Sequence, residues 1–128
     1  MFKRPENCRV SLLPSEDRES SLPGLASHPQ HLLASKQMAG FGGMVSFYLK
    51  GDFEACRRIL NQVKIFALAE SLGKVESLIE HSASITHSSV PKEETDRIGV
   101  SDSLIRLSVG IEDVEDLVTD LSQALEHV

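Results

Sequence analysis

The sequence has little of several features that mark well-known protein classes. Its two cysteines, Cys8 and Cys56, are too few for a four-cysteine zinc site or a framework of disulfides. Tryptophan is absent, and no apolar run is long enough to cross a bilayer. The 13 lysines and arginines are outnumbered by 19 acidic residues, so the positive field that attracts nucleic acid is missing. We therefore expect no nucleic-acid partner, no membrane partner and a cytoplasmic location, where sparing use of cysteine is usual.

The first 21 residues also lack the periodic apolar pattern of a helix or a strand. They contain Pro5 and Pro14, mix both signs of charge, and have no apolar stretch of the kind found in secretory signals. We predict an irregular N-terminal arm at residues 1–21. Residues 22–128 are enough for one domain, and the 41% hydrophobic and 25% charged content of the chain is typical of a soluble globular protein.

Helix and strand patterns alternate along residues 22–128. Ser27 and Gln30 have the spacing of a helix capping box, and Glu54 with Arg58 has the spacing of an ion pair on one helix face. The patterns predict a helix at 28–38, a strand at 45–49, a helix at 53–61, a strand at 65–69, an extended segment at 75–87, a short helix between Pro91 and Gly99, a strand at 104–109 and a closing helix at 114–125, which Glu112 and Asp113 precede. This alternation favours an α/β fold of the α+β two-layer type, one sheet carrying helices on one face. The other face of the sheet then needs a partner.

Arg106 is the one charged residue within an otherwise apolar strand. Ile105, Leu107 and Val109 share one face of that strand, and Arg106 points to the other. A guanidinium in such a place needs a carboxylate, which is either an acid of this protein or a ligand, and the sequence leaves both open. The loop that begins Glu70-Ser71 follows a predicted strand and offers a carboxylate and a hydroxyl. Together with Arg106, it is suited to hold the carboxylate of an amino acid.

Other chemically capable residues favour ordinary structural roles. His28 and His31 lie one helical turn apart, but no cysteine or acid nearby completes a metal site, so we expect no metal. The glycines at 40–43 precede a strand instead of a helix, which favours a turn over a phosphate cradle. Cys56 lies within a predicted helix as a small half-buried residue, and the alternative is a thiol made reactive by Arg57 and Arg58. No nucleophile motif is present, so we predict no catalytic residues.

Several ordered segments resemble the C-terminal domain of the Cys/Met-metabolism pyridoxal-phosphate (PLP) enzymes, especially the cystathionine gamma-lyases and gamma-synthases. The resemblance covers nearly everything from Leu22 to the end of the chain. The segments that carry it are Pro23-Gly24-Leu25, Ser27-His28-Pro29-Gln30-His31, Gly42-Gly43-Met44-Val45-Ser46-Phe47, Leu68-Ala69-Glu70-Ser71-Leu72-Gly73, Val75-Glu76-Ser77-Leu78-Ile79-Glu80-His81, Thr86-His87, Ser101-Asp102 and Leu104-Ile105-Arg106-Leu107-Ser108-Val109-Gly110-Ile111-Glu112-Asp113.

The resemblance implies a small domain that packs on a large PLP-binding domain, with the active site between them and at a homo-oligomer interface. In that family the arginine matching Arg106 pairs with the α-carboxylate of a small amino-acid substrate. The serine matching Ser71 helps to hold the same group. The glutamate matching Glu70 lines the distal end of the pocket in members that handle cystathionine. The implied function is that of the substrate-carboxylate-binding part of a transsulfuration enzyme.

The sequence departs from the family pattern in ways that matter for activity. Lys74 replaces a usual glycine, Ser82 a proline and Ile85 a methionine. The lysine that forms the Schiff base with PLP lies upstream in the family, and none of the six lysines here stands in its sequence context. We therefore expect no cofactor-binding residue, no covalent attachment of PLP and no catalysis by this chain alone.

Two other functions remain open besides that of a part of an enzyme. One is a non-catalytic interaction module that associates with a full-length relative through the sheet face that the PLP-binding domain would cover. Self-association and an exposed apolar patch would favour it. The other is a small amino-acid-binding domain that keeps Arg106 without catalysis, which ranks last because half a pocket is poorly preorganised.

Overall fold

A computed structural model of the chain describes residues 20–127. The arm predicted at residues 1–21 lies outside the described residues except at its last two positions, and these are not irregular. Ser20–Ser21 form strand β1, which pairs antiparallel with β2 (Met44–Tyr48) through Ser20 opposite Phe47. Backbone pairing requires no apolar side chain, so a strand of two serines leaves no hydrophobic period to detect.

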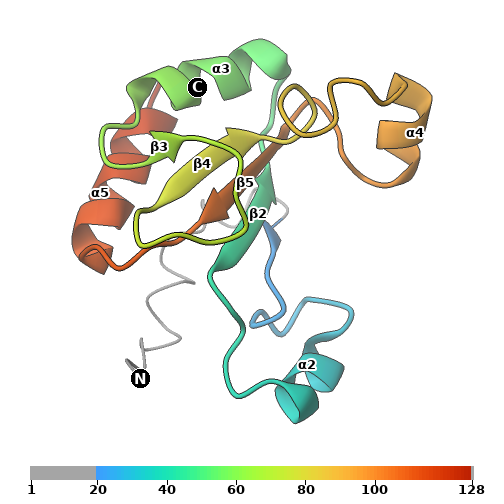
Figure 1. The fold of residues 1–128 in the computed structure, drawn as a ribbon, viewed down its shortest axis with the longest axis vertical. Helices are drawn as coiled ribbons and strands as arrows, with labels where there is room; N and C mark the ends of the chain where they lie inside the picture. Colours follow the sequence, from blue (N-terminus) through green and yellow to red (C-terminus); the bar gives the residue numbers. More distant parts are fainter. Residues whose placement is uncertain (1–19, 128) are drawn as a thin grey trace.

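The five strands form one mixed sheet in the order β1-β2-β5-β4-β3 (Figure 1). The central strand β5 (Leu104–Ser108) is antiparallel to β2 on one side and to β4 (Leu78–His81) on the other. The edge strand β3 (Ala67–Leu68) is parallel to β4. The predicted strands at 45–49 and 104–109 are confirmed to within a residue at each end. Strand β5, which carries Arg106, is thus paired with another strand on each side.

Two helices cover one face of this sheet. They are α3 (Phe53–Gln62) and α5 (Val114–Leu125), which pack against each other and against the strands (Figure 1). Burying their apolar stripes against the sheet is the main stabilising contribution to a fold of this size. The predicted α/β sandwich with helices on one face is confirmed. The core comprises Val45, Phe47, Ile79, Ile105 and Leu107 of the sheet with Cys56, Ile59, Leu117, Leu121 and Ala124 of the helices.

Aspartates begin both of these helices. The side chain of Asp52 accepts a hydrogen bond from the amide of Ala55, and that of Asp113 accepts one from Glu115, as helix N-caps do. The ion pair predicted between Glu54 and Arg58 is wrong, because Glu54 pairs with Arg57 at 2.8 Å instead. Both spacings bring side chains together on a helix, and here the shorter one is used.

Two shorter helices lie away from the sheet in Figure 1. Helix α2 (His31–Gln37) begins three residues later than predicted, and the capping box is wrong, because Gln30 is the N-cap and makes no side-chain capping bond. The preceding residues form successive four-residue turns, in which the amide of His28 donates to the carbonyl of Leu25 and that of His31 to the carbonyl of His28. Helix α4 (Lys92–Arg97) follows Pro91 and ends before Gly99, whose φ of 82° favours glycine, as predicted.

The strands predicted at 65–69 and 75–87 are shorter than expected, and side chains explain both cases. Asp120 of α5 accepts hydrogen bonds from the amides of residues 64–66, so these amides do not join the sheet. After β4 the chain turns back, and the Thr86 hydroxyl donates to the Ser82 carbonyl. Serine and threonine compete with strand pairing through such local bonds.

Candidate functional site

The candidate site lies on the sheet face opposite α3 and α5. Side chains alternate along a strand, and Ile105 and Leu107 point into the core, so Arg106 points to the other face. Strand pairing places Ser46 of β2 and Glu80 of β4 directly opposite Arg106. A polar row therefore crosses the middle of this face.

Arg106 finds its carboxylate partner within the protein. Its Nη2 lies 2.5 Å from Oε1 of Glu80, whose side chain is 3% exposed, while the Arg106 side chain is 22% exposed. One of the two alternatives left open by the sequence is thereby established. Sequence analysis missed Glu80 because it predicted an extended segment at 75–87 without strand pairing, and only the pairing sets Glu80 against Arg106.

The pair leaves binding capacity on both partners. Nε of Arg106 and Oε2 of Glu80 are buried, and neither has a hydrogen-bond partner among the described residues. A guanidinium carries five N–H donors in a planar fork, and the ion pair engages one nitrogen. Because Nε is buried, a second carboxylate would bind the remaining N–H donors on the exposed side of Arg106.

The Glu70–Ser71 loop leaves the sheet at the level of this polar row. The amide of Ala69 still bonds to the carbonyl of Ile79, which precedes Glu80. Two strand spacings, about 10 Å, therefore separate the backbone at Ala69 from that at Arg106. Ser71 is half-buried and Glu70 is exposed. The described residues include no hydrogen bond from either side chain to Arg106.

The far end of the same loop is held by Glu112. Oε1 of Glu112 accepts from the amide of Ser77 and Oε2 accepts from its hydroxyl, both at 2.7 Å. The Ser77 hydroxyl oxygen also accepts from the amide of Gly110 at 2.8 Å. A Cβ at Gly110 would lie 2.3 Å from the carbonyl oxygen of Val75, so this contact requires glycine. Sequence analysis assigned Glu112 to the start of the closing helix, whereas it serves to hold the loop.

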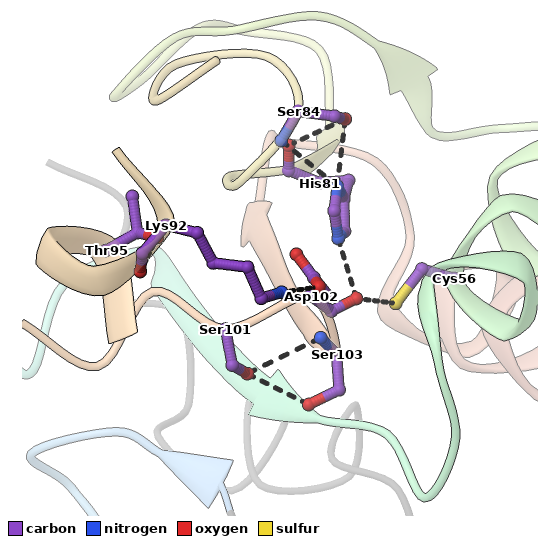
Figure 2. A network of polar contacts seen from close by, with 8 residues as sticks. All are labelled: Cys56, His81, Ser84, Lys92, Thr95, Ser101, Asp102 and Ser103. Atoms are coloured by element: carbon purple, nitrogen blue, oxygen red, sulfur yellow. Dashed lines mark hydrogen bonds and ion pairs between the residues drawn. The ribbon is translucent and has the colours of Figure 1, made fainter. Parts of the chain in front are cut away.

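A second polar network fixes the end of β4 against the turn before β5 (Figure 2). The backbone carbonyl of Asp102 accepts from His81 Nε2 at 2.8 Å and from Cys56 Sγ at 3.4 Å. The carboxylate of Asp102 pairs with Lys92 of α4, and this bond raises the pKa of that lysine. His81 Nδ1 lies 2.8 Å from the Ser84 hydroxyl. The network anchors the strands that carry Glu80 and Arg106.

The Cys56 thiol is unreactive. Burial, together with the nearby negative charges of Asp102 and Asp52, raises its pKa to about 12. The thiolate is the nucleophilic form of cysteine, and with this pKa Cys56 stays a protonated thiol at neutral pH, so it is inert. The structural interpretation of this cysteine is supported, and Arg57 and Arg58 do not activate it.

The remaining candidates serve local structure. His31 Nδ1 lies 2.8 Å from the Pro23 carbonyl, and His28 Nδ1 accepts from the amide of Gln30. Within residues 20–127, no group of three histidine, cysteine or acidic side chains is arranged to hold a metal ion. None of the helices in that range is long and apolar enough to span a membrane. The bend at 40–43 leads into β2, and Gly42 has a φ of 78°.

Comparison with known proteins gives this geometry its context. The model of the Cys/Met metabolism PLP-dependent enzyme family matches residues 16–126. The chain belongs to this family. Its curated relatives include the cystathionine gamma-lyase of Dictyostelium discoideum, 60% identical over 104 residues, and an L-methionine gamma-lyase of Fusobacterium nucleatum, 55% identical over 106 residues. These alignments cover 81% and 83% of the chain and 27% of each relative, so the chain spans about a quarter of a family enzyme.

Solved structures of family members share the fold. Cystathionine gamma synthase from Xanthomonas oryzae pv. oryzae, solved in complex with cystathionine, superposes with a TM-score of 0.86 at 44% identity. A putative O-acetylhomoserine (thiol)-lyase from Campylobacter jejuni superposes with a TM-score of 0.85 at 40% identity. Each covers 94% of this chain, and the chain covers 33% and 29% of them. The fold expected from the resemblance is confirmed.

Proposed function

We propose that this chain is the substrate-carboxylate-binding part of a PLP-dependent transsulfuration enzyme of the cystathionine gamma-lyase or gamma-synthase type. The observation that carries the proposal is Arg106, which is held in the middle of a sheet, partly exposed, with donor capacity that Glu80 does not use. A fixed guanidinium matches the two oxygens of a carboxylate in a planar, bidentate geometry. The family relationship makes an amino-acid carboxylate its natural ligand.

The site residues have separate tasks in this proposal. Arg106 binds and orients the α-carboxylate of the substrate. Ser71 lies on the loop after β3 and donates its hydroxyl to the same carboxylate, exchanging its weak 3.4 Å contacts with Gly73 for a charged acceptor. Glu70 is exposed beside it and faces the distal part of the substrate. Holding the carboxylate fixes the α-carbon in space, which is the entropic part of catalysis.

The cofactor is held elsewhere in the family fold. When bound, PLP supplies the electron sink for carbanion chemistry. The lysine that holds it needs a sheltered pocket, and all five lysines within residues 20–127 are exposed. Lys74, the one beside the candidate site, pairs with Glu76 at 3.7 Å. We propose that no residue of this chain attaches PLP and that the chain does not catalyse by itself.

Completing the site requires a partner that carries the cofactor. We propose that this partner is the PLP-binding domain or a full-length relative, within a homo-oligomer. Large apolar side chains near the site loop support this, because Leu72 is 74% exposed, Val75 65% and Ile111 72%. Large apolar side chains left exposed near one loop are typical of interaction sites.

A chimeric enzyme tests the proposed function directly. Residues 22–128 replace the corresponding segment of the Dictyostelium discoideum cystathionine gamma-lyase, and cystathionine cleavage is measured. We expect an active chimera and a loss of about 100-fold in kcat/KM for Arg106→Ala, the size of a charged hydrogen-bonded pair. Arg58→Ala, at an exposed position of α3, is the matched control and should retain full activity. A folded Arg106→Ala chimera as active as its parent would refute the proposal.

A further inference from the structure

Glu80 is a buried acidic residue in the interior of the sheet. It lies in the interior strand β4, flanked by β3 and β5, and its side chain is 3% exposed. A carboxylate removed from water is destabilising unless opposite charge and hydrogen bonds compensate for it. Arg106, directly across the strand pair, supplies the opposite charge at 2.5 Å.

Ser82 supplies the hydrogen bond. Its hydroxyl donates to Oε1 of Glu80 at 2.9 Å, and Oε1 is also the atom that contacts Arg106. Ser82 is 2% exposed, so water does not compete strongly for this bond. The two contacts fix one oxygen of Glu80 in space. The guanidinium that reaches this oxygen is thereby fixed as well.

The contact between the two charges is nevertheless incomplete. An arginine and a carboxylate can form two parallel hydrogen bonds, and here only the Nη2 to Oε1 contact is made. Nε of Arg106 and Oε2 of Glu80 are both buried and both lack a partner. Glu80 thus contacts the guanidinium through one nitrogen and leaves its other N–H donors without a bond to Glu80. A guanidinium with all its donors engaged would bind a ligand poorly, and one with no partner would be mobile.

We propose that Glu80, fixed by Ser82, is a positioning residue that holds the Arg106 guanidinium in the orientation needed to bind a ligand carboxylate. The proposal rests on the proposed function for the identity of the ligand and goes beyond it in assigning Glu80 and Ser82. An arginine side chain has many rotamers, and ordering it before the ligand arrives removes that cost from binding.

Positioning and simple charge make opposite predictions. Glu80 is negative and lies beside a site for an anion, so by charge alone its removal should strengthen carboxylate binding. If Glu80 positions Arg106, its removal weakens binding even though a repelling charge has gone. The sign of the change in affinity therefore distinguishes the two.

The experiment uses the full 128-residue chain labelled with nitrogen-15. The side-chain Nε signal of Arg106 is assigned by its disappearance in Arg106→Lys, and L-cystathionine is the titrated probe. We expect a distinct Arg106 signal in the wild type and its collapse into the signals of mobile arginines in Glu80→Ala. We expect the affinity for L-cystathionine to fall about tenfold in the same variant, the effect of one unfixed side chain.

Milder variants and a matched control accompany this test. Glu80→Gln keeps an acceptor for Arg106 and should lose about threefold in affinity, as should Ser82→Ala. Glu76→Gln removes an equal charge from an exposed acid four residues earlier and should leave the Arg106 signal unchanged. Backbone spectra identify the variants that retain the fold. If Glu80→Ala does not fold, Glu80→Gln and Ser82→Ala decide the question.

Two results would overturn the proposal. One is an unchanged Arg106 signal in the folded Glu80 variants, and the other is tighter binding of L-cystathionine by Glu80→Ala. A wild-type chain that binds no L-cystathionine, in which Glu80→Ala still releases Arg106, would instead refute carboxylate binding by the isolated chain, and the chimera would then test binding in the completed site. In that case the positioning of Arg106 by Glu80 stands, so failure of the inference differs from failure of the proposed function.

Discussion

The two faces of the central sheet use the same strands and neighbouring residues, yet they do different work. On the face under α3 and α5, Ile79 and Leu107 are fully buried among apolar side chains. Glu80, which follows Ile79, and Arg106, which precedes Leu107, form a charged pair on the other face. A packed apolar face supplies most of the stability of a small domain, and a charged face supplies orientation. Mutations on the two faces should therefore separate stability from binding.

The largest effect is expected on the apolar face. Phe47→Ala removes a fully buried aromatic ring and should lower the free energy of unfolding by about 3–5 kcal/mol. Urea denaturation monitored by circular dichroism measures this. Leu72→Ala, at a side chain that is 74% exposed, is the control and should change stability by no more than about 0.5 kcal/mol. Similar losses at the two positions would show that this face is not the stabilising one.

A polar anchor at the edge of the apolar layer should have the next largest effect. Asp120→Ala leaves the amides of residues 64–66 without their acceptor and should destabilise the chain by about 2 kcal/mol. Asp116→Ala removes an exposed acid from the same helix and should change stability by about 0.5 kcal/mol. Hydrogen exchange of the Lys64 and Ile65 amides should accelerate in Asp120→Ala alone. Unchanged exchange would contradict the assignment.

Cys56 provides a titratable group within the apolar layer. The pKa of its thiol is raised to about 12 from an ordinary value of 9, so above pH 9 the unfolded thiol loses its proton while the folded one keeps it. Stability contributed by this group is complete below pH 9 and falls as the pH rises toward 12, by on the order of 1 kcal/mol per pH unit. Comparing wild type with Cys56→Ala between pH 9 and 11 isolates it. Parallel pH profiles would contradict the shift.

The smallest effect is expected on the polar side of the comparison. Ser71→Ala should leave stability unchanged and weaken L-cystathionine binding about threefold, because one hydroxyl donor is lost at a partly exposed site. Ser89→Ala, at an exposed serine, is the control. Calorimetric titration of both variants of the full chain measures the difference. A stability loss in Ser71→Ala would mean that this serine belongs to the fold and not to the site.

The apolar periodicity of the sequence predicted the buried face of the sheet and the helix α5 that packs near it. Alternation placed Phe47 and Leu107 on the buried face, and a stripe of leucines located α5. Arg106 was identified as the charged residue in an apolar strand, and the resemblance to the family implied its ligand. Polar residues that act across long stretches of chain carry no periodic signal, so the roles of Glu80, Glu112 and Asp120 were not predicted. Their partners lie 26, 35 and 54–56 residues away and depend on the strand order.

The acids that hold the site loop also determine when that loop can form during synthesis. Asp120 holds residues 64–66 before it, and Glu112 holds Ser77 at its far end. Both acids follow the loop in the sequence, so the ribosome synthesises the loop well before the acidic residues that hold it by hydrogen bonds. An unfinished chain cannot keep Ser71 in place. Premature release of the nascent polypeptide should therefore yield a product in which proteases can reach residues 70–76.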